Sequence, residues 1–195
     1  MAAEKSKKMT AFIIIIQLIY LLLAIILVIY LINIIFSFKK LVPYVPTPYK
    51  VIKQMIKLAE IKPADKIIDL GSGSGRIILK VACHYPNSVT GIDNSSVLIL
   101  TTKFRFWLNK VFKKLKTKNY KIIKGNFLEF ELSDYSLVFC FLTNTAMEKL
   151  KENFEQLPAG SRIISYHFHF ASDKFSEKMI PLSKRGKIFI YQKLG

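Results

Sequence analysis

The sequence predicts an α/β fold in which seven strands form a mostly parallel sheet with an antiparallel C-terminal hairpin, behind an N-terminal transmembrane helix. Three observations lead to this prediction. Apolar strand-like runs alternate with helical segments after residue 60, the first run ends in a glycine-rich turn, and no charged residue occurs from Met9 to Phe38. Strand–helix alternation gives parallel strands with right-handed crossovers.

Residues 1–10 form a basic tail, and residues 11–38 are predicted to cross a bilayer. At 1.5 Å per residue this helix would be about 42 Å long, against a hydrocarbon core of roughly 30 Å, so it is expected to tilt. The apolar run is too long for a signal peptide and is followed by Lys39 and Lys40, which favours an uncleaved anchor.

Lysines are more numerous on the C-terminal side of this span than on the N-terminal side. The positive-inside rule therefore predicts a single-pass membrane protein whose remaining chain is cytoplasmic, or on the matrix side in an organelle. Residues 39–195 hold 27 Lys or Arg and 12 Asp or Glu, a net charge of about +15. Attraction to anionic lipid, nucleic-acid binding and a compositional bias without specific role all remain compatible with this charge.

Residues 39–60 are read as a connector followed by a helix. Pro43, Pro46 and Pro48 impose extended backbone, and apolar residues then recur at helical spacing from Pro48 to Glu60. The remaining chain, residues 61–195, forms the predicted α/β domain. Its expected strands are 66–70, 88–92, 120–124, 137–142, 162–168, 179–182 and 187–191, and its expected helices are 74–84, 95–115 and 146–157.

The helix predicted over 95–115 has an apolar stripe and a basic face. The stripe is formed by Val97, Leu100, Phe104, Leu108, Val111 and Leu115. We expect the stripe to pack on the sheet, with the lysines in solvent. The alternative is an amphipathic helix that lies on a membrane surface.

The stretch from Asp69 to Arg76, DLGSGSGR, is the most informative motif. Glycines can adopt conformations and close approaches that side chains block, and the following helix start offers unpaired N–H groups to a nucleotide-like ligand. Asp93, at the end of the second strand, could accept hydrogen bonds from ribose hydroxyls. A structural turn without a ligand is the competing interpretation of the glycines. The G-x-G-x-G spacing after an acidic residue resembles motif I of the class I S-adenosylmethionine-dependent methyltransferases, which implies a Rossmann-like sheet and that cofactor.

The order of apolar helix, VPYVPTP connector, DLGSGSGR, GID and a late strand ending SYHFHF resembles a narrower group. These are the single-pass protein-lysine methyltransferases that act on the mitochondrial ATP synthase c subunit and the adenine nucleotide translocase, with their prokaryotic relatives. The resemblance implies a membrane-protein substrate, and it implies that the connector is needed for activity. The family usually has Asp where Ser74 stands and Glu where Asp93 stands.

The resemblance also assigns site residues. Those expected around the cofactor are Asp69, Gly71, Ser72, Gly73, Gly75, Asp93, Asn126 and Phe127. Those expected along the channel for the substrate amine are Tyr44, Thr47, Asn144 and His167. His167 and His169 are two residues apart, so we expect them on one strand face, where either could accept a proton. No metal site is predicted, because the cysteines and histidines lack metal-binding spacing.

Two rival functions remain open. A methyltransferase acting on a lipid or another small membrane-associated molecule would have the same anchor, and a non-catalytic basic tether would have the same charge. The segment from Phe141 to Asn144, FLTN, lacks the motif of enzymes that methylate nucleic-acid amines, which disfavours nucleic acid as a partner.

Overall fold

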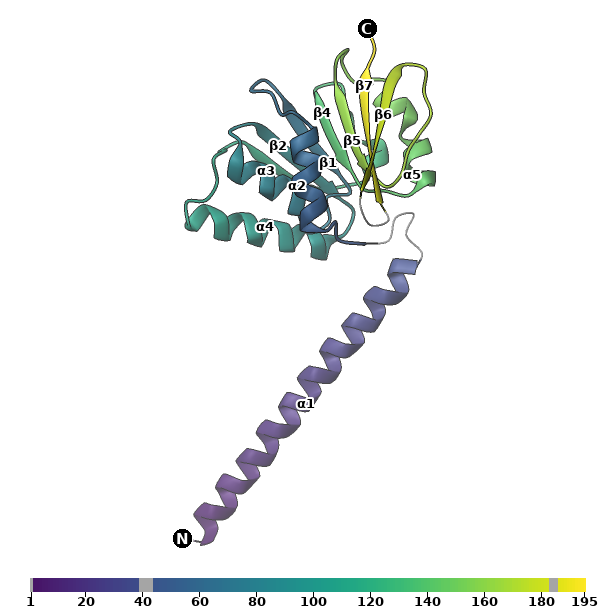
Figure 1. Ribbon diagram of the computed structural model, residues 1–195. Helices are drawn as coiled ribbons and strands as arrows, with labels where there is room; N and C mark the ends of the chain where they lie inside the picture. Colours follow the sequence, from purple (N-terminus) through teal and green to yellow (C-terminus); the bar gives the residue numbers. More distant parts are fainter. Residues whose placement is uncertain (1, 39–43, 183–185) are drawn as a thin grey trace. The chain divides into compact units, whose positions relative to one another are not determined.

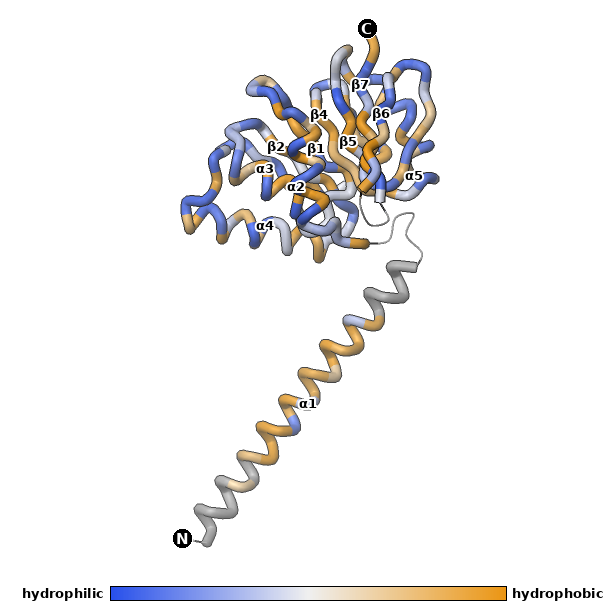
Figure 2. The backbone as a smooth tube through the Cα atoms, in the orientation of Figure 1, coloured by the Kyte–Doolittle hydropathy of each residue, from blue (hydrophilic) through white to orange (hydrophobic). Residues whose placement is uncertain are grey.

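The computed structural model describes residues 2–38, 44–182 and 186–195, and divides the chain into two compact units, residues 1–43 and 44–195. The described residues of the first unit form one helix, α1 (Ala2–Phe38), which includes residues 2–10 of the predicted basic tail, while Met1 lies outside the described residues. Within α1, Phe12–Leu31 is long and apolar enough to cross a membrane, and none of it is buried (Figure 2). A signal sequence near an N-terminus meets the same criterion of length and composition.

The second unit contains a seven-stranded sheet in the order β3-β2-β1-β4-β5-β7-β6 (Figure 1). The strands are β1 (Lys66–Leu70), β2 (Ser88–Asp93), β3 (Tyr120–Lys124), β4 (Leu137–Cys140), β5 (Arg162–Tyr166), β6 (Phe175–Leu182) and β7 (Gly186–Lys193). The first five strands are parallel, and β7 pairs antiparallel with both β5 and β6. The predicted mostly parallel sheet with a C-terminal antiparallel hairpin is confirmed.

Helices cover both faces of the sheet (Figure 1). They are α2 (Tyr49–Leu58), α3 (Arg76–His84), α4 (Ser96–Val111), α5 (Asn144–Lys149) and α6 (Lys151–Phe154), with a 3₁₀ turn η1 (Phe127–Glu129). One core cluster joins buried residues of α2, α3 and α4 to β1, β2, β4, β5 and β7. On the other face, α5 and α6 bury Met147 and Phe154, and Met147 contacts Cys140 of β4. Successive residues of a strand point to opposite faces of the sheet, and helices cover both faces. Every residue of a central strand is therefore buried against a helix layer, which explains the continuous apolar runs in the parallel strands.

Several predicted boundaries differ from the structure. Helix α3 begins at Arg76 rather than Ser74, because Gly75 has a left-handed conformation with φ 70°. The single helix predicted over 146–157 is two short helices. Strand β5 ends at Tyr166, two residues before the predicted end, because the next residue has a positive φ.

The prediction that the apolar stripe of α4 packs on the sheet is wrong for four of its six residues, whereas Leu108 is half-buried and Leu115, beyond the end of the helix, packs against the core. Val97, Leu100, Phe104 and Val111 are exposed, whereas the helix buries Ile99, Thr102 and Phe106 on its other side. The hydrophobic periodicity of the sequence identified the helix correctly, but it could not tell which of two apolar faces contacts the sheet.

Candidate active site

The predicted cofactor residues meet at the carboxyl edge of the parallel strands. Strand β1 lies between β2 and β4, and the chain proceeds to β3 on one side and β5 on the other. In open α/β sheets, ligands bind outside the carboxyl ends of the strands where the strand order reverses in this way. The Asp69–Arg76 segment, which we call the glycine loop, follows β1 at this point.

The glycine loop needs its glycines for conformation and for space. Gly71, Gly73 and Gly75 have φ values of 69°, 54° and 70°, in the left-handed region that other residues enter at a cost. A Cβ on Gly73 would lie 2.7 Å from Cε2 of Tyr44. The loop therefore lies in close contact with an aromatic ring, in a conformation that glycine alone adopts freely.

The Asp93 carboxylate holds the glycine loop against the end of β2. Its Oδ2 accepts a hydrogen bond from Gly73 N at 2.8 Å, and its Oδ1 accepts one from Ser95 N at 2.8 Å. Ser72 N also donates to Ile92 O at 2.9 Å. Each carboxylate oxygen has two lone pairs, so acceptor capacity remains for ligand hydroxyl groups.

Asp69 is the buried acidic group of the site, with 3% of its surface exposed. Burial raises the pKa of its carboxyl well above the ordinary value, and the nearby charge of Asp93 raises it further. A cation placed beside these two groups would favour their ionised forms. The pair is therefore suited to a positively charged ligand.

Two buried polar atoms of the glycine loop lack a hydrogen-bond partner. These atoms are Ser72 Oγ and Arg76 Nε, and no other such side-chain atom occurs in the described ranges of the chain. Buried polar groups without partners are uncommon and cost stability. Their position in this loop, together with the glycine conformations and Asp69, fits a site for a polar, positively charged nucleoside ligand.

The connector residue Tyr44 reaches the glycine loop. Its hydroxyl donates to Ser74 Oγ at 2.9 Å, and its ring covers Gly73. Thr47 is buried, and its carbonyl oxygen accepts a hydrogen bond from Arg76 Nη1 at 3.4 Å. The structure thus brings these two predicted channel residues beside the predicted cofactor residues.

Two arginines that were not predicted as site residues hold this arrangement. Arg105 of α4 donates from Nη1 to Ser74 O at 2.6 Å and from Nη2 to Tyr49 Oη at 3.4 Å. The Arg76 guanidinium lies 5.1 Å from the centroid of the Tyr49 ring, a cation–π arrangement. The position of Arg76 directly after the last glycine was the available signal, whereas Arg105 carried none.

Asn126 and Phe127 lie after β3. Asn126 caps η1, because its Oδ1 accepts from Leu128 N at 3.1 Å and its Nδ2 donates to Glu129 Oε1 at 2.6 Å. Phe127 is buried, and its ring would lie 3.9 Å from a Cβ on Gly71. Phe127 therefore neighbours the glycine loop, while the Asn126 amide is engaged within its own turn.

Asn144 and His167 follow β4 and β5 at the same edge of the sheet, and both are exposed. His167 has φ 75° and donates its backbone N–H to Lys187 O at 2.7 Å. This left-handed residue ends the strand, so the expectation that His167 and His169 share a strand face is wrong. Within the described residues, neither Asn144 nor His167 forms a side-chain hydrogen bond to the glycine loop.

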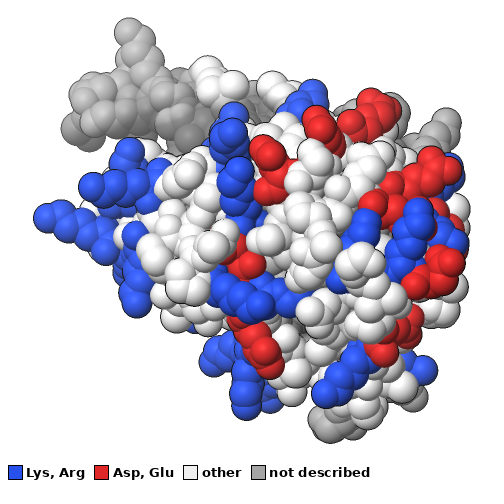
Figure 3. Space-filling model, turned by 90° about the horizontal axis from the view of Figure 1, so that it is seen from above, with Lys and Arg blue, Asp and Glu red and all other residues white. Residues whose placement is uncertain are grey.

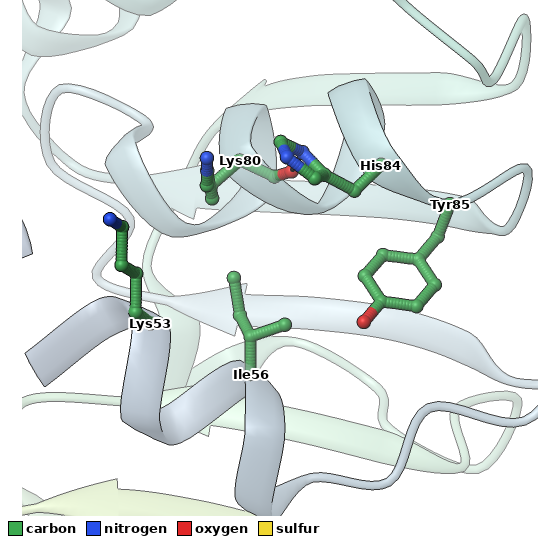
Figure 4. Close-up of a pocket in the computed structure, with 5 residues that line it drawn as sticks. All are labelled: Lys53, Ile56, Lys80, His84 and Tyr85. Carbon is green, nitrogen blue, oxygen red and sulfur yellow. Dashed lines mark hydrogen bonds between the residues drawn. The ribbon is translucent and has the colours of Figure 1, made fainter.

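A small pocket lies elsewhere, between α2 and α3 (Figure 4). It is lined by Lys53, Ile56, Lys80, His84 and Tyr85 and has a volume of about 100 Å³. This is below the roughly 300–1,000 Å³ of typical small-molecule sites. No group of His, Cys, Asp and Glu suited to a metal ion occurs among the residues that the structure describes.

Solved structures with this arrangement include an RNA methyltransferase from Salinibacter ruber in complex with S-adenosyl-L-homocysteine. It superposes with a TM-score of 0.66 and 25% sequence identity, over 77% of this chain and 94% of that chain. The sheet and the glycine loop thus define an S-adenosylmethionine-dependent methyltransferase, and S-adenosylmethionine is its cofactor.

The sequence comparisons specify the family. The family model of the ANTKMT methyltransferase domain matches residues 69–176, and the chain belongs to this family. A protein-lysine N-methyltransferase from Saccharolobus islandicus (strain REY15A) is 36% identical over 129 residues, which cover 65% of this chain and 77% of that protein. The lysine N-methyltransferase of the ATP synthase c subunit in Caenorhabditis elegans is 25% identical over 133 residues, or 65% of this chain and 67% of that protein.

Proposed function

We propose that the chain is a membrane-anchored protein-lysine N-methyltransferase that modifies a membrane protein. The observation that carries the proposal is the contact of Tyr44 with the glycine loop. Tyr44 belongs to the connector that begins directly after the apolar helix α1, so the segment next to the proposed anchor contributes to the cofactor site. The lysine-methylating relatives support the amine as acceptor.

The cofactor, when bound, supplies an electrophilic methyl group on a sulfonium. The protein must hold this group and present a neutral amine to it. Asp93 keeps the glycine loop in place through Gly73 N, and its remaining lone pairs are directed to the ribose hydroxyls in this proposal. Asp69 stabilises the positive charge of the ligand in its ionised form.

The lysine substrate requires deprotonation before transfer. A free lysine amine has a pKa of about 10.4, so the neutral form at pH 7 costs roughly 4.6 kcal/mol. A dry channel lowers that cost, because burial disfavours the charged amine. We assign the channel walls to Tyr44, Thr47, Asn144 and His167, of which His167 is the candidate proton acceptor. Alignment of amine and methyl group supplies most of the remaining rate.

Methyl labelling tests the proposal. Membranes from cells that lack the protein are incubated with tritiated S-adenosylmethionine and purified enzyme, with the Asp69→Ala variant as control. The proposal predicts a labelled membrane protein whose hydrolysate contains methyl-lysine. Label recovered only in extracted lipid would instead identify a lipid methyltransferase, and label confined to soluble proteins would contradict the membrane substrate.

A further inference from the structure

Helix α4 exposes a stripe of large apolar side chains that has no partner in the described part of the chain. We call it the α4 stripe, and it consists of Val97, Leu100, Phe104, Trp107 and Val111. Each is between 55% and 69% exposed, and the rings of Phe104 and Trp107 stack with centroids 5.7 Å apart. Single exposed apolar residues are ordinary, but a contiguous row on one helix indicates a binding surface.

The helix cannot rotate to bury this stripe. Its opposite side is fixed in the core through Ile99 and Phe106. Thr102 Oγ1 donates to Gly73 O at 3.0 Å, and Arg105 Nη1 donates to Ser74 O at 2.6 Å. Turning α4 would break the contacts that hold the glycine loop. The stripe is therefore a permanent feature of the surface.

The part of the sequence that contains the stripe is basic. Residues 94–128 contain no acidic residue, and their nine basic residues are Lys103, Arg105, Lys110, Lys113, Lys114, Lys116, Lys118, Lys121 and Lys124. Seen from above in Figure 3, blue side chains gather on the left of the domain and red ones mostly on the right, so the charge of the domain is unevenly distributed. An apolar row flanked by lysines is complementary to an interface of anionic headgroups over hydrocarbon.

We propose that the α4 stripe docks into the surface of an anionic lipid bilayer, the same bilayer that α1 crosses. The inference rests on the proposed membrane anchoring and adds a second, peripheral contact to it. Nucleic acid fits less well, because phosphates would match the lysines but not the exposed Leu100 and Val97. Trp and Phe are among the side chains that interfacial amphipathic helices place at the boundary between headgroups and acyl chains.

Only a short stretch of chain connects the proposed anchor to the domain that carries the stripe. Five residues, 39–43, separate the end of α1 from Tyr44. At no more than about 3.6 Å per residue, these residues allow a separation of at most roughly 20 Å between Phe38 and Tyr44. Because the anchor holds the domain beside the membrane, binding of the stripe to lipid is an intramolecular step. Even a weak affinity of the stripe for lipid is then sufficient for docking. Because α4 also holds the glycine loop, docking would fix the loop relative to a substrate in the membrane.

The chain contains its own reporter for this test, since Trp107 is its sole tryptophan. The full chain is reconstituted into phosphatidylcholine–phosphatidylglycerol vesicles that contain lipids brominated on the acyl chains, which quench nearby tryptophan. We expect strong quenching of Trp107, and weaker quenching in phosphatidylcholine alone or in about 1 M salt, where charges are screened beyond about 3 Å. Flotation after an alkaline wash reports insertion of α1 independently.

Variants separate docking from anchoring. Leu100→Gln and Phe104→Gln should each lower the ratio of docked to undocked domain about tenfold or more. Met179→Gln is the matched control, because Met179 is an exposed apolar residue on β6 and should leave quenching unchanged. A chain that floats with an unquenched Trp107 overturns the docking proposal alone. A chain that does not float contradicts the anchor and, with it, the docking.

A second copy of the chain is the other possible occupant of the stripe. In that case Trp107 would be shielded without brominated-lipid quenching, and the shielding would fade as protein is diluted into excess lipid. This result would also overturn the proposal.

Discussion

Replacement of Gly73 by alanine tests whether the connector and the glycine loop act as one unit. The substitution puts a Cβ at φ 54°, which costs about 1–2 kcal/mol for a residue other than glycine. The new Cβ also falls 2.7 Å from Tyr44 Cε2, so the ring must move and its hydrogen bond to Ser74 Oγ is lost, at about 0.5–1.5 kcal/mol. The sum is about 1.5–3.5 kcal/mol. Tyr44 is 44% exposed and can swing away, so we expect the fold to survive.

Methyl-transfer kinetics on the full chain in detergent measure the consequence. We expect Gly73→Ala to lower kcat/KM at least tenfold, and Gly160→Ala to leave it unchanged. Gly160 is the matched control, because its φ is 78° and a Cβ there would meet no atom within 4 Å. We also compare the double variant Tyr44→Ala/Gly73→Ala with Tyr44→Ala alone. Without the Tyr44 ring there is no clash, so Gly73→Ala should lower kcat/KM less in this comparison than it does in the unmodified protein. Strictly additive losses would refute a coupling between Tyr44 and the loop.

Three further predictions concern charge and the amine channel. Affinity for S-adenosylmethionine should rise with pH, because burial raises the pKa of Asp69 and a cationic ligand favours the ionised carboxylate. Calorimetric titrations at several pH values should show a weaker pH dependence for Asp69→Asn. Asp65→Ala should destabilise the domain by about 3 kcal/mol in thermal unfolding, because it leaves the largely buried Arg162 side chain without its ion-pair partner, and an unchanged Tm would contradict this. His167→Ala should lower kcat with little change in cofactor affinity, and unaltered turnover would remove His167 from the mechanism.

The Asp65–Arg162 pair also determines the direction in which the stability of the domain changes as pH falls. Burial alone would raise the pKa of Asp65, but hydrogen bonds from Lys62 N, Arg162 and Ser136 outweigh burial and lower it. A lowered pKa means that the stabilisation is present above the ordinary value of about 3.9 and is lost as pH falls below it. Asp65→Asn should make the loss of stability in that range less steep, as urea titrations at several pH values would measure.

The parallel strands were predictable because their signal is local. Continuous apolar runs mark β1 and β4, the boundaries of β3 match the prediction, and the glycines and Asp93 mark the carboxyl ends of β1 and β2 without tertiary information. Features that depend on tertiary contacts were not predictable. The exposure of the α4 stripe depends on which face of α4 packs against the core. The role of Arg105 depends on its hydrogen bond to Ser74, a residue far from it in the sequence. The left-handed His167 was also missed, since a positive φ is uncommon for any residue other than glycine and the identity of the residue gives only a weak signal for it.

We propose that the glycine loop and Asp93 hold the cofactor. Calorimetric titration of S-adenosylmethionine into the full chain tests it most directly, with the variants Asp93→Ala and Lys80→Gln beside the unmodified protein. We expect one binding site that is weakened strongly by Asp93→Ala, which releases Gly73 N and Ser95 N, and is unchanged by Lys80→Gln in the pocket between α2 and α3. Binding that persists in Asp93→Ala and is lost in Lys80→Gln would contradict it.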